Sequence, residues 1–545
     1  MNTLYRFLIT IPFLVLATSC EKFLDRDPLD QAAENTFWNT EEDAIAGVNA
    51  VYTALPDARD FWRDCHSDNS VMTNAWGEGG MGYISMGSHT AADGYINEEW
   101  KYDLIRRALY ALDQLSGMEM DGELKQRLVS EVRFILAMRY FRMTQLFGDI
   151  PLIKEEPVAL DESDLPRATR AEVLAYVIEN VDTAIEGLPI SYAGADAGRI
   201  TKGAAYMLKA NVYLYLASIK KFHENQHDAQ LWKEAYQAAK QVTTLGYSLE
   251  DDYGSLFRSE SNHANDEVIL ARQYVKDMIT HMTPVLASPA GTGITGSGWA
   301  SFCPTRALVD SYLCTDGLTI QESPLYDVDN PWEHRDERLK QTFMLPGVPV
   351  LRPSGEYTPY QPHPSYGMPE RMNNEGGGLT GFMYLKFNEP TLTQPTESFT
   401  NWPIYRYAET FLIIAEALNE AEPGNVEIAE AINAVRERAG VKPVGPAQLT
   451  DQGAVREIIR AERRHEFVAE HKRYFDILRW KIAETVLDEP AYGINSNVND
   501  PIGDWTKPSF VAQQRVFDAQ KHYLWPIPQT AVDRNPNLLP QNPNW

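Results

Sequence analysis

Apolar residues recur at the spacing of an α-helix through most of the chain, and this periodicity predicts a mainly α fold. The first predicted helix begins after Asn39 or Thr40, either of which can cap it, with Glu42 and Asp43 in its first turn. Longer predicted helices follow, most of them in consecutive pairs, over residues 101–115, 124–147, 170–187, 202–222, 231–245, 404–421 and 426–439.

Several of these segments place a small residue among bulky neighbours. Ala137 lies in FILAMRYF, Ala210 in LKANVYLY and Ala415 in LIIAEAL. Alternation of small and large side chains is typical of antiparallel helix pairs that nest as tetratricopeptide-type hairpins. Because the pairs are irregular and far apart in the sequence, we expect a scaffold of tetratricopeptide-like hairpins and not a clean solenoid.

Two segments lack the helical period. Residues 60–99 are rich in Gly, Asn and aromatic residues and are predicted to form a long loop. Residues 246–403 contain scattered prolines, and only short apolar runs such as 267–270 are compatible with single strands. An irregular segment of this length is usually functional, and binding residues tend to lie on loops that a rigid scaffold holds. We therefore expect the ligand to bind in this loop-rich insertion.

A charged stretch over residues 454–481 stands out near the C-terminal end. One helical face starts apolar, with Val455 and Ile459, and then turns acidic with Glu462 and Glu466. Three arginines crowd the same turns: Arg460, Arg463 and Arg464. A surface helix would place its charges on the far side. Buried charges are tolerated when they pair, so the pattern favours a structural ion-pair lock over a catalytic site.

The N-terminus has the pattern of an export signal. Arg6 precedes an apolar run over residues 7–17, which is too short to span a membrane. Small residues then lead into Cys20, as in a bacterial lipobox, in which the cysteine is acylated and anchors the protein to a membrane. The alternative is an ordinary secretory signal with a chance cysteine. The predicted organisation is a signal peptide over 1–19, a helical region over 20–245, the loop-rich insertion over 246–403 and a C-terminal helical region over 404–545.

Cysteine count and charge narrow the possible classes of protein further. Beyond Cys20 the chain has Cys65, Cys303 and Cys314, an odd number, so at least one thiol is free; pairing of Cys303 with Cys314 stays open. A formal net charge of −27 argues against nucleic acid and against docking on anionic lipid. A mean hydropathy of −0.37 excludes a polytopic membrane protein.

Two patterns match enzyme motifs. Residues His223 to His227 form HExxH, which on a helix would place two imidazoles on zinc. Lysines precede it and polar residues fill it, so we expect a chance match at a frayed helix end. Residues Gly291 to Gly296 form GxGxxG, but prolines surround it where a dinucleotide fold needs a strand and a helix. We expect a flexible loop, no metal site, no cofactor and no catalytic residue.

Ordered motifs along nearly the whole chain resemble the SusD/RagB family. They include FWNTEEDAIAGVNAVY, EVRFILAMRYFRMTQLFGDIPLI, ALVDSYLCTDG, HRDERLKQTFMLPG and the tail WPIPQTAVDRNPNLLPQNPNW. The charged stretch matches the family signature at Glu462, Arg463, Glu466, Phe467, Arg473, Asp476, Arg479 and Trp480. One departure is His471, where the family usually has glycine, which predicts a left-handed backbone conformation at this residue.

The resemblance implies a surface lipoprotein, anchored in the outer membrane and facing the cell exterior, with a tetratricopeptide-like scaffold. Such a protein would bind an oligosaccharide, or in some members a peptide, and deliver it to a SusC-like TonB-dependent β-barrel transporter without catalysing a reaction. A surface-anchored hydrolase and a purely structural scaffold are the alternatives. The resemblance also assigns Glu462, Arg463, Glu466 and Arg479 to locking the C-terminal helices against the hairpins.

Loop aromatics are the candidate ligand contacts, because sugar rings stack on Trp or Tyr while polar groups take the hydroxyls. The family places its ligand in loops of these regions but shares no ligand motif, so only locations carry over. The candidates are Trp76, Tyr83 and Tyr95 in the first Gly-rich loop, Trp299 in the second, and Tyr360 and Tyr366 in the Pro-rich one. Packing in the core is the alternative role for each, and Trp76 and Trp299 are the strongest candidates.

Overall fold

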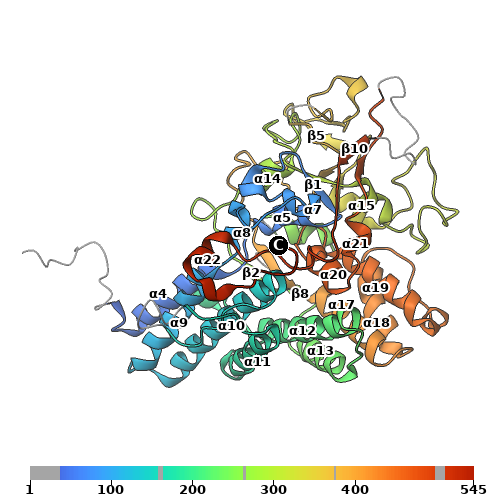
Figure 1. Ribbon diagram of the computed structural model, residues 1–545. Coiled ribbons are helices and arrows are strands. Elements are labelled where there is room, and N and C mark those ends of the chain that lie inside the picture. The colour runs from blue at the N-terminus through green and yellow to red at the C-terminus, as the bar shows by residue number, and fades with distance from the viewer. Residues whose placement is uncertain (1–36, 157–163, 260, 262–264, 374–375, 498–509) are drawn as a thin grey trace, which may run out of the picture.

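Long helices pack side by side along one side of the molecule (Figure 1). The computed structural model describes residues 37–156, 164–259, 261, 265–373, 376–497 and 510–545. In order of packing, the array contains α9 (Tyr102–Gly117), α10 (Gly122–Phe147), α11 (Arg170–Gly187), α12 (Lys202–Ser218), α13 (Ala229–Val242), α17 (Tyr407–Ala421), α18 (Val426–Arg438) and α19 (Gln452–Glu466). α4 (Glu41–Val51) packs against α9 and α10 at the N-terminal end. The mainly α fold and the long helices are therefore confirmed.

Side-chain caps explain where several helices begin. Thr40, one of the two predicted caps, accepts from the N–H of Asp43 at 3.2 Å, and the Asp43 carboxylate accepts the N–H of Thr40 in return. Thr169 and Glu172 form the same reciprocal box at the start of α11. The C-terminal end of α12 comes earlier than predicted. The helix was expected to run to residue 222, but residues 219–223 form a π-turn.

The array continues in space across a long interruption in sequence. α13 packs directly against α17, although residues 243–406 separate them. The chain leaves and returns through an antiparallel pair, β2 (Val268–Arg272) and β8 (Trp402–Arg406). The predicted strand near 267–270 is thus confirmed. The predicted helix start at Ile404 is wrong, because residues 404–406 pair with β2 and the helix begins only at Tyr407.

The insertion between β2 and β8 consists mostly of loops around small elements. Its helices are α14 (Thr283–Ala287), α15 (Arg306–Ser311) and α16 (Glu337–Thr342). Its strands are β3 (Phe302–Pro304), β4 (Phe343–Met344), β5 (Pro349–Leu351), β6 (Tyr357–Pro359) and β7 (Met383–Tyr384). β4 pairs with β7 and β5 with β6, all antiparallel. Nearer the C-terminus, β9 (Ala491–Gly493) pairs with β10 (Phe510–Gln513).

Residues 60–99 are more ordered than the loop that was predicted. They contain α5 (Asp60–Arg63), β1 (Ser70–Met72), α6 (Gly77–Gly80), α7 (Tyr83–Met86) and α8 (Gly94–Glu98). These helices are too short to show a helical period in the sequence. Their apolar side chains join one cluster of buried residues that also includes the long helices and the C-terminal tail, which carries α22 (Gln529–Arg534).

The structure shows whether Cys303 and Cys314 pair and whether a described helix could cross a membrane. Cys65, Cys303 and Cys314 are all buried free thiols, so Cys303 and Cys314 are not paired. Among the described residues, no helix combines the length and the apolar character that crossing a bilayer requires. The predicted signal peptide and the lipidation residue Cys20 lie outside the described residues.

The charged stretch over 454–481 forms two helices and not one. α19 ends at Glu466, and α20 spans Arg473–Arg479. Between them His471 has φ 56°, which confirms the predicted left-handed conformation, and Ala469 has φ 60°. The buried Asp64 carboxylate accepts the N–H of Ala469 at 3.3 Å and helps to hold this turn.

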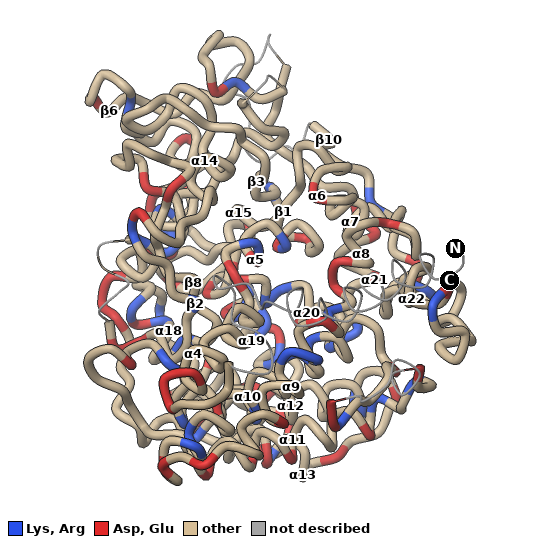
Figure 2. The backbone as a smooth tube through the Cα atoms, turned by 90° about the vertical axis from the view of Figure 1, so that its left-hand side faces the viewer, with Lys and Arg blue, Asp and Glu red and all other residues tan. Residues whose placement is uncertain are grey.

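The acidic face of α19 lies inside a buried network of opposite charges. Glu466 accepts from Arg338 at 3.0 Å, from Arg406 at 2.9 Å and from Arg438. The network as a whole joins five carboxylates, Asp336, Glu267, Glu462, Glu466 and Glu470, to five cations, Arg338, Arg406, Arg436, Arg438 and Lys386. Burial alone would raise the pKa of Glu466, but Arg438, Arg406 and Arg338 outweigh it and hold the pKa well below its usual range. Figure 2 shows acidic and basic positions side by side around α19 and α20.

A second set of pairs joins α19 to α20 and α17. Arg463 binds Asp476 through two hydrogen bonds of 2.9 and 3.1 Å. Asp476 also accepts from Arg479, which in turn binds Glu416 on α17 at 2.7 Å. The predicted lock of the C-terminal helices against the hairpins is therefore present.

Replacing Glu466 by alanine should destabilise the fold strongly. The change leaves three arginines buried with fewer carboxylates, and breaking a buried pair in this way costs about 3–5 kcal/mol. Urea unfolding measures the loss. Glu457→Ala is the matched control on the same helix, because the Glu457 side chain is 68% exposed and, among the described residues, forms an ion pair with Arg460 alone. The control should change the free energy of unfolding by less than about 0.5 kcal/mol. Equal effects of the two variants would contradict the assignment of the lock.

Asp64→Asn should flatten the dependence of stability on pH. Burial raises the pKa of Asp64 to about 7. An acid whose pKa is higher in the folded than in the unfolded state stabilises the fold while protonated, and this stability is lost as pH rises from about 4 to about 7. Between pH 5 and pH 8 the wild type should therefore lose about 2 kcal/mol that the variant retains. Melting curves at both pH values measure this, with Asp113→Asn on the surface of α9 as control. A variant that loses as much stability as the wild type would refute the prediction.

Candidate ligand-binding site

Two exposed tryptophans extend from the same end of one short ladder. β1 pairs antiparallel with β3, Met72 lies opposite Phe302, and the pairing continues as Thr73 donates its N–H to Ser301 O at 2.9 Å. The chain leaves β1 toward Trp76 and enters β3 from Trp299. The ladder therefore brings these two segments together, although more than two hundred residues separate them in sequence.

The backbone on each side of this ladder is fixed while the indoles remain in solvent. Trp299 donates its N–H to Val285 O at 2.8 Å, and Ala300 donates to Ser288 O at 2.9 Å. Trp76 directly precedes α6, and a Cβ on Gly77 would lie 2.7 Å from Met72 Cε, so the turn is tightly packed. Trp76 is 70% exposed and Trp299 is 53% exposed. Large apolar rings on a rigid backbone are suited to stacking on a ligand.

Tyr83 and Tyr366 keep part of their surface in solvent. Tyr83 is half-buried, and its ring packs over Gly80, where a Cβ would lie 2.8 Å from Tyr83 Cδ2. Tyr366 is 41% exposed and lines a separate hollow of about 540 Å³ together with Trp332 and His363. The structure therefore distributes the predicted aromatics over more than one surface.

Tyr95 and Tyr360 do not face solvent, which corrects their selection as ligand contacts. The Tyr95 ring is buried beside Trp525, with centroids 5.7 Å apart, and its hydroxyl accepts from Arg63 Nε at 2.9 Å. Tyr360 is fully buried in a small cluster with Cys303. Tyr95 lies on α8 and Tyr360 in a loop, and both segments fold back on the core. Composition alone cannot distinguish an inward from an outward aromatic residue.

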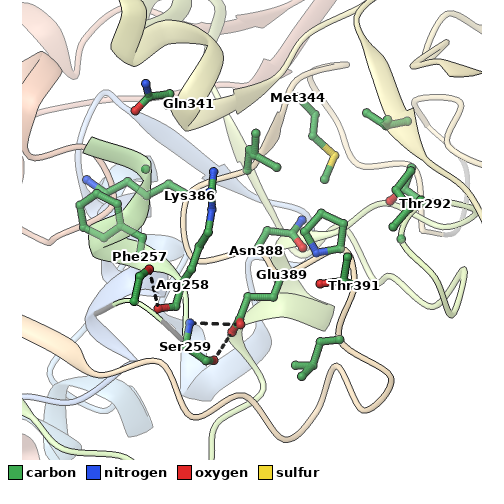
Figure 3. Close-up of a pocket in the computed structure, with 18 of the residues that line it drawn as sticks. Phe257, Arg258, Ser259, Thr292, Gln341, Met344, Lys386, Asn388, Glu389 and Thr391 are labelled. Carbon is green, nitrogen blue, oxygen red and sulfur yellow. Dashed lines mark hydrogen bonds between the residues drawn. The ribbon is translucent and has the colours of Figure 1, made fainter. Parts of the chain in front are cut away.

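A cavity of about 810 Å³ lies within the insertion (Figure 3). All its lining residues come from positions 254–399, inside the segment in which the ligand was predicted to bind. Its volume is that of a site for a small molecule or short oligomer. Sequence reasoning missed its residues, because they come from five separate segments near positions 257, 276, 292, 345 and 389. Only the irregular, proline-rich character of the insertion pointed to this region.

Glu389 fixes the floor of this cavity. Its Oε1 accepts from the hydroxyls of Ser259 at 2.6 Å, Ser398 at 2.9 Å and Thr400 at 2.7 Å. Its Oε2 accepts the N–H of Ser259 at 3.1 Å. Figure 3 shows the two bonds to Ser259. The four donors occupy both carboxylate oxygens, so Glu389 positions the floor.

The GxGxxG segment is a loop, as expected, and it forms one wall of the cavity; backbone hydrogen bonds hold it, where a flexible loop was expected. Gly291 and Gly293 have φ of 75° and 70°, which glycine adopts without strain. Gly293 donates its N–H to Leu351 O at 2.8 Å, and Ile294 donates to Pro390 O at 2.7 Å. The same loop leads directly to Trp299. It is therefore a structural element between the cavity and the exposed tryptophan.

The HExxH segment does not have the geometry of a zinc site. His223 ends the π-turn after α12, and its Nε2 lies 2.8 Å from Leu478 O. The chain then turns through Asn225, at φ 55°, and His227 is exposed outside any helix. The two imidazoles therefore do not share a helical face. Among the described residues, no group of three or more His, Cys, Asp or Glu side chains is arranged to hold a metal ion.

Comparison with known families covers most of the chain. Residues 266–545 match the model of the SusD family. The chain belongs to the SusD family. Residues 22–214 match a second SusD-like model, described as "Starch-binding associating with outer membrane". The predicted family is thus confirmed.

Relatives in the SusD family match over nearly their full length. SusD-like protein P2 of Formosa agariphila is 25% identical over 99% of this chain and 100% of its own. Starch-binding protein SusD of Bacteroides thetaiotaomicron is 23% identical over 96% of this chain and 95% of its own. A crystal structure of a SusD-like carbohydrate-binding protein from Bacteroides fragilis is 26% identical, covers 92% of this chain and 100% of its own, and has a TM-score of 0.80.

Proposed function

We propose that this chain binds an oligosaccharide at the cell surface and delivers it, unchanged, to a SusC-like TonB-dependent β-barrel transporter. The observation that carries the proposal is the pair of exposed tryptophans, Trp76 and Trp299, at one end of the β1–β3 ladder. Membership of the SusD family supports it, because relatives are described as starch-binding and carbohydrate-binding proteins. Tyr83 and Tyr366 are additional contacts in this proposal.

Stacking explains how two indoles can select a sugar chain. Each pyranose ring presents an apolar C–H face that can cover an indole, while its hydroxyls remain hydrogen-bonded to polar groups or water. An exposed tryptophan on a fixed backbone loses little conformational freedom when it binds, which lowers the cost of association. A site of this kind holds its ligand without reacting with it, as release to a transporter requires.

Trp76→Ala and Trp299→Ala should each weaken binding of an oligosaccharide ligand about tenfold, and the double variant should abolish measurable binding. Loss of one stacking ring corresponds to about 1–2 kcal/mol. Isothermal titration against a panel of neutral oligosaccharides, with a peptide library as a second panel, measures the effect. Trp76→Phe and Trp299→Phe are the controls, because a smaller ring should retain part of the affinity. Unchanged affinity in the double alanine variant would refute the site, and hydrolysis of the ligand would refute binding without turnover.

Anchoring and partnership require a separate test. We expect the full chain, extracted from outer membranes with mild detergent, to co-purify with a large β-barrel protein. Cys20→Ala should release the protein from the membrane, because each methylene of an acyl chain adds about 0.8 kcal/mol of membrane binding and the variant has none. Membrane fractionation and mass spectrometry of the captured complex measure both outcomes. A wild-type protein found only in the soluble fraction would contradict the lipid anchor.

A further inference from the structure

The cavity of about 810 Å³ has slightly more basic than acidic residues in its lining, although the protein as a whole is acidic. The chain contains 76 acidic and 49 basic residues, yet Arg258, Lys276, Lys340 and Lys386 all line this cavity. Lys386 is bound by Glu470 at 2.7 Å and Lys340 by Glu333 at 2.9 Å, and both carboxylates lie outside the lining. Glu389 is occupied by its four donors, and Asp277 and Glu397 lie on the exposed rim.

Within the described part of the chain, two lining cations remain available to a ligand: Lys276, on the exposed rim, and Arg258. The nearest acidic partner of Arg258 is Asp252, with Nη1 and Oδ2 4.0 Å apart, and the Arg258 guanidinium donates no hydrogen bond to a described residue. In Figure 3 the side chain extends away from the Ser259–Glu389 floor toward the side on which Gln341 lies. A planar guanidinium in this position can bind a carboxylate through two parallel hydrogen bonds.

Gln341 places a second unsatisfied group next to Arg258. Its Oε1 is buried and accepts no hydrogen bond from the described residues. A Cβ on Gly254 would lie 3.1 Å from Arg258 Nη2, 3.3 Å from Asp252 Oδ1 and 3.4 Å from Gln341 Oε1, so all three atoms border the same small space. A ligand carboxylate would therefore have to bind the edge of the guanidinium that faces away from Asp252. A buried acceptor without a donor costs about 1–3 kcal/mol, which a ligand hydroxyl would recover. The pair therefore fits a ligand that carries a carboxylate beside a hydroxyl.

The remaining walls fit the ring of such a ligand. Met344, Val350 and Leu351 are buried apolar residues of the lining. Tyr357, on β6 at the rim, is 67% exposed and offers an aromatic face. A pyranose has one apolar face and a polar edge, and it can stack on such a ring while its substituents reach the polar groups.

We infer that this cavity binds a uronic acid residue of an oligosaccharide, with Arg258 on the carboxylate, Gln341 on an adjacent hydroxyl and Tyr357 against the ring. The inference rests on the proposed function in taking the ligand to be a glycan. It adds a second site, lined by residues other than Trp76 and Trp299, and it makes the preferred substrate an acidic polysaccharide.

Titration of the folded protein with oligouronates tests this directly. The probes are oligomers of galacturonate, glucuronate and mannuronate, together with the fully methyl-esterified form of each, which keeps the sugar and removes the charge. We expect at least one free acid to bind and Arg258→Gln to weaken it about tenfold or more, as for loss of a charged hydrogen-bonded pair. The variant should leave any binding of the ester unchanged. Arg107→Gln, exposed on α9, is the matched control for charge.

The outcomes separate this inference from the proposed function. If neutral oligosaccharides bind through Trp76 and Trp299 but no uronate depends on Arg258, the second site is refuted and the proposed function stands. If uronate binding depends on Arg258 but alanine at both tryptophans leaves every ligand unaffected, the tryptophan site is refuted instead. A sulfated oligosaccharide that binds through Arg258 when no uronate does would overturn the assignment to uronic acid.

Discussion

The buried charge network around Glu466 is the interaction on which the rest of the structure depends. It connects α19 to α16, which lies in the insertion, and to β8 and α18, which follow it. Glu267, which lies just before β2, joins the network through Arg406 and Arg438. Charges this deep are costly unless every partner is present, and the matched set of carboxylates and cations supplies them. The network therefore requires one arrangement of these segments, which apolar packing alone would specify less strictly.

This arrangement of segments determines how the loops around the cavity and the exposed tryptophans are held. The floor of the cavity is fixed by Glu389 and the exposed tryptophans by backbone hydrogen bonds, while Lys386 connects the cavity wall to Glu470 in the network. Because their backbone is held in this way, polar and aromatic side chains can remain exposed to solvent in the geometry that a ligand needs. In the proposed function, stability and recognition reside in different parts of the chain, which are joined at a small number of buried charges.

Sequence patterns predicted the helical array and the lock, because both leave local signals. Periodicity identified α11 to the residue, and the charges on α19 indicated burial before any partner was known. Tertiary contacts decided the rest. Residues 404–406 became a strand because β2 lies beside them, and Arg338 and Arg406 could not be named as partners of Glu466 from spacing alone. Tertiary contacts also decided that Tyr95 and Tyr360 are buried. The cavity could not be predicted, because its residues form no continuous motif in the sequence.

The β2–β8 pair has a consequence for how such a protein can change. Because the two ends of the insertion are held together as neighbouring strands, extra residues in its exposed loops alter mainly the entropy of closing a loop. That cost rises by about 0.6 kcal/mol for each doubling of loop length. The exposed loops between Arg272 and Trp402 can therefore grow, shrink or be exchanged as long as β3 keeps its pairing with β1, Arg338 and Lys386 keep their place in the network, and the core residues of the insertion keep their packing. New ligand specificities can arise in the loops of the insertion while the helices of the array stay unchanged.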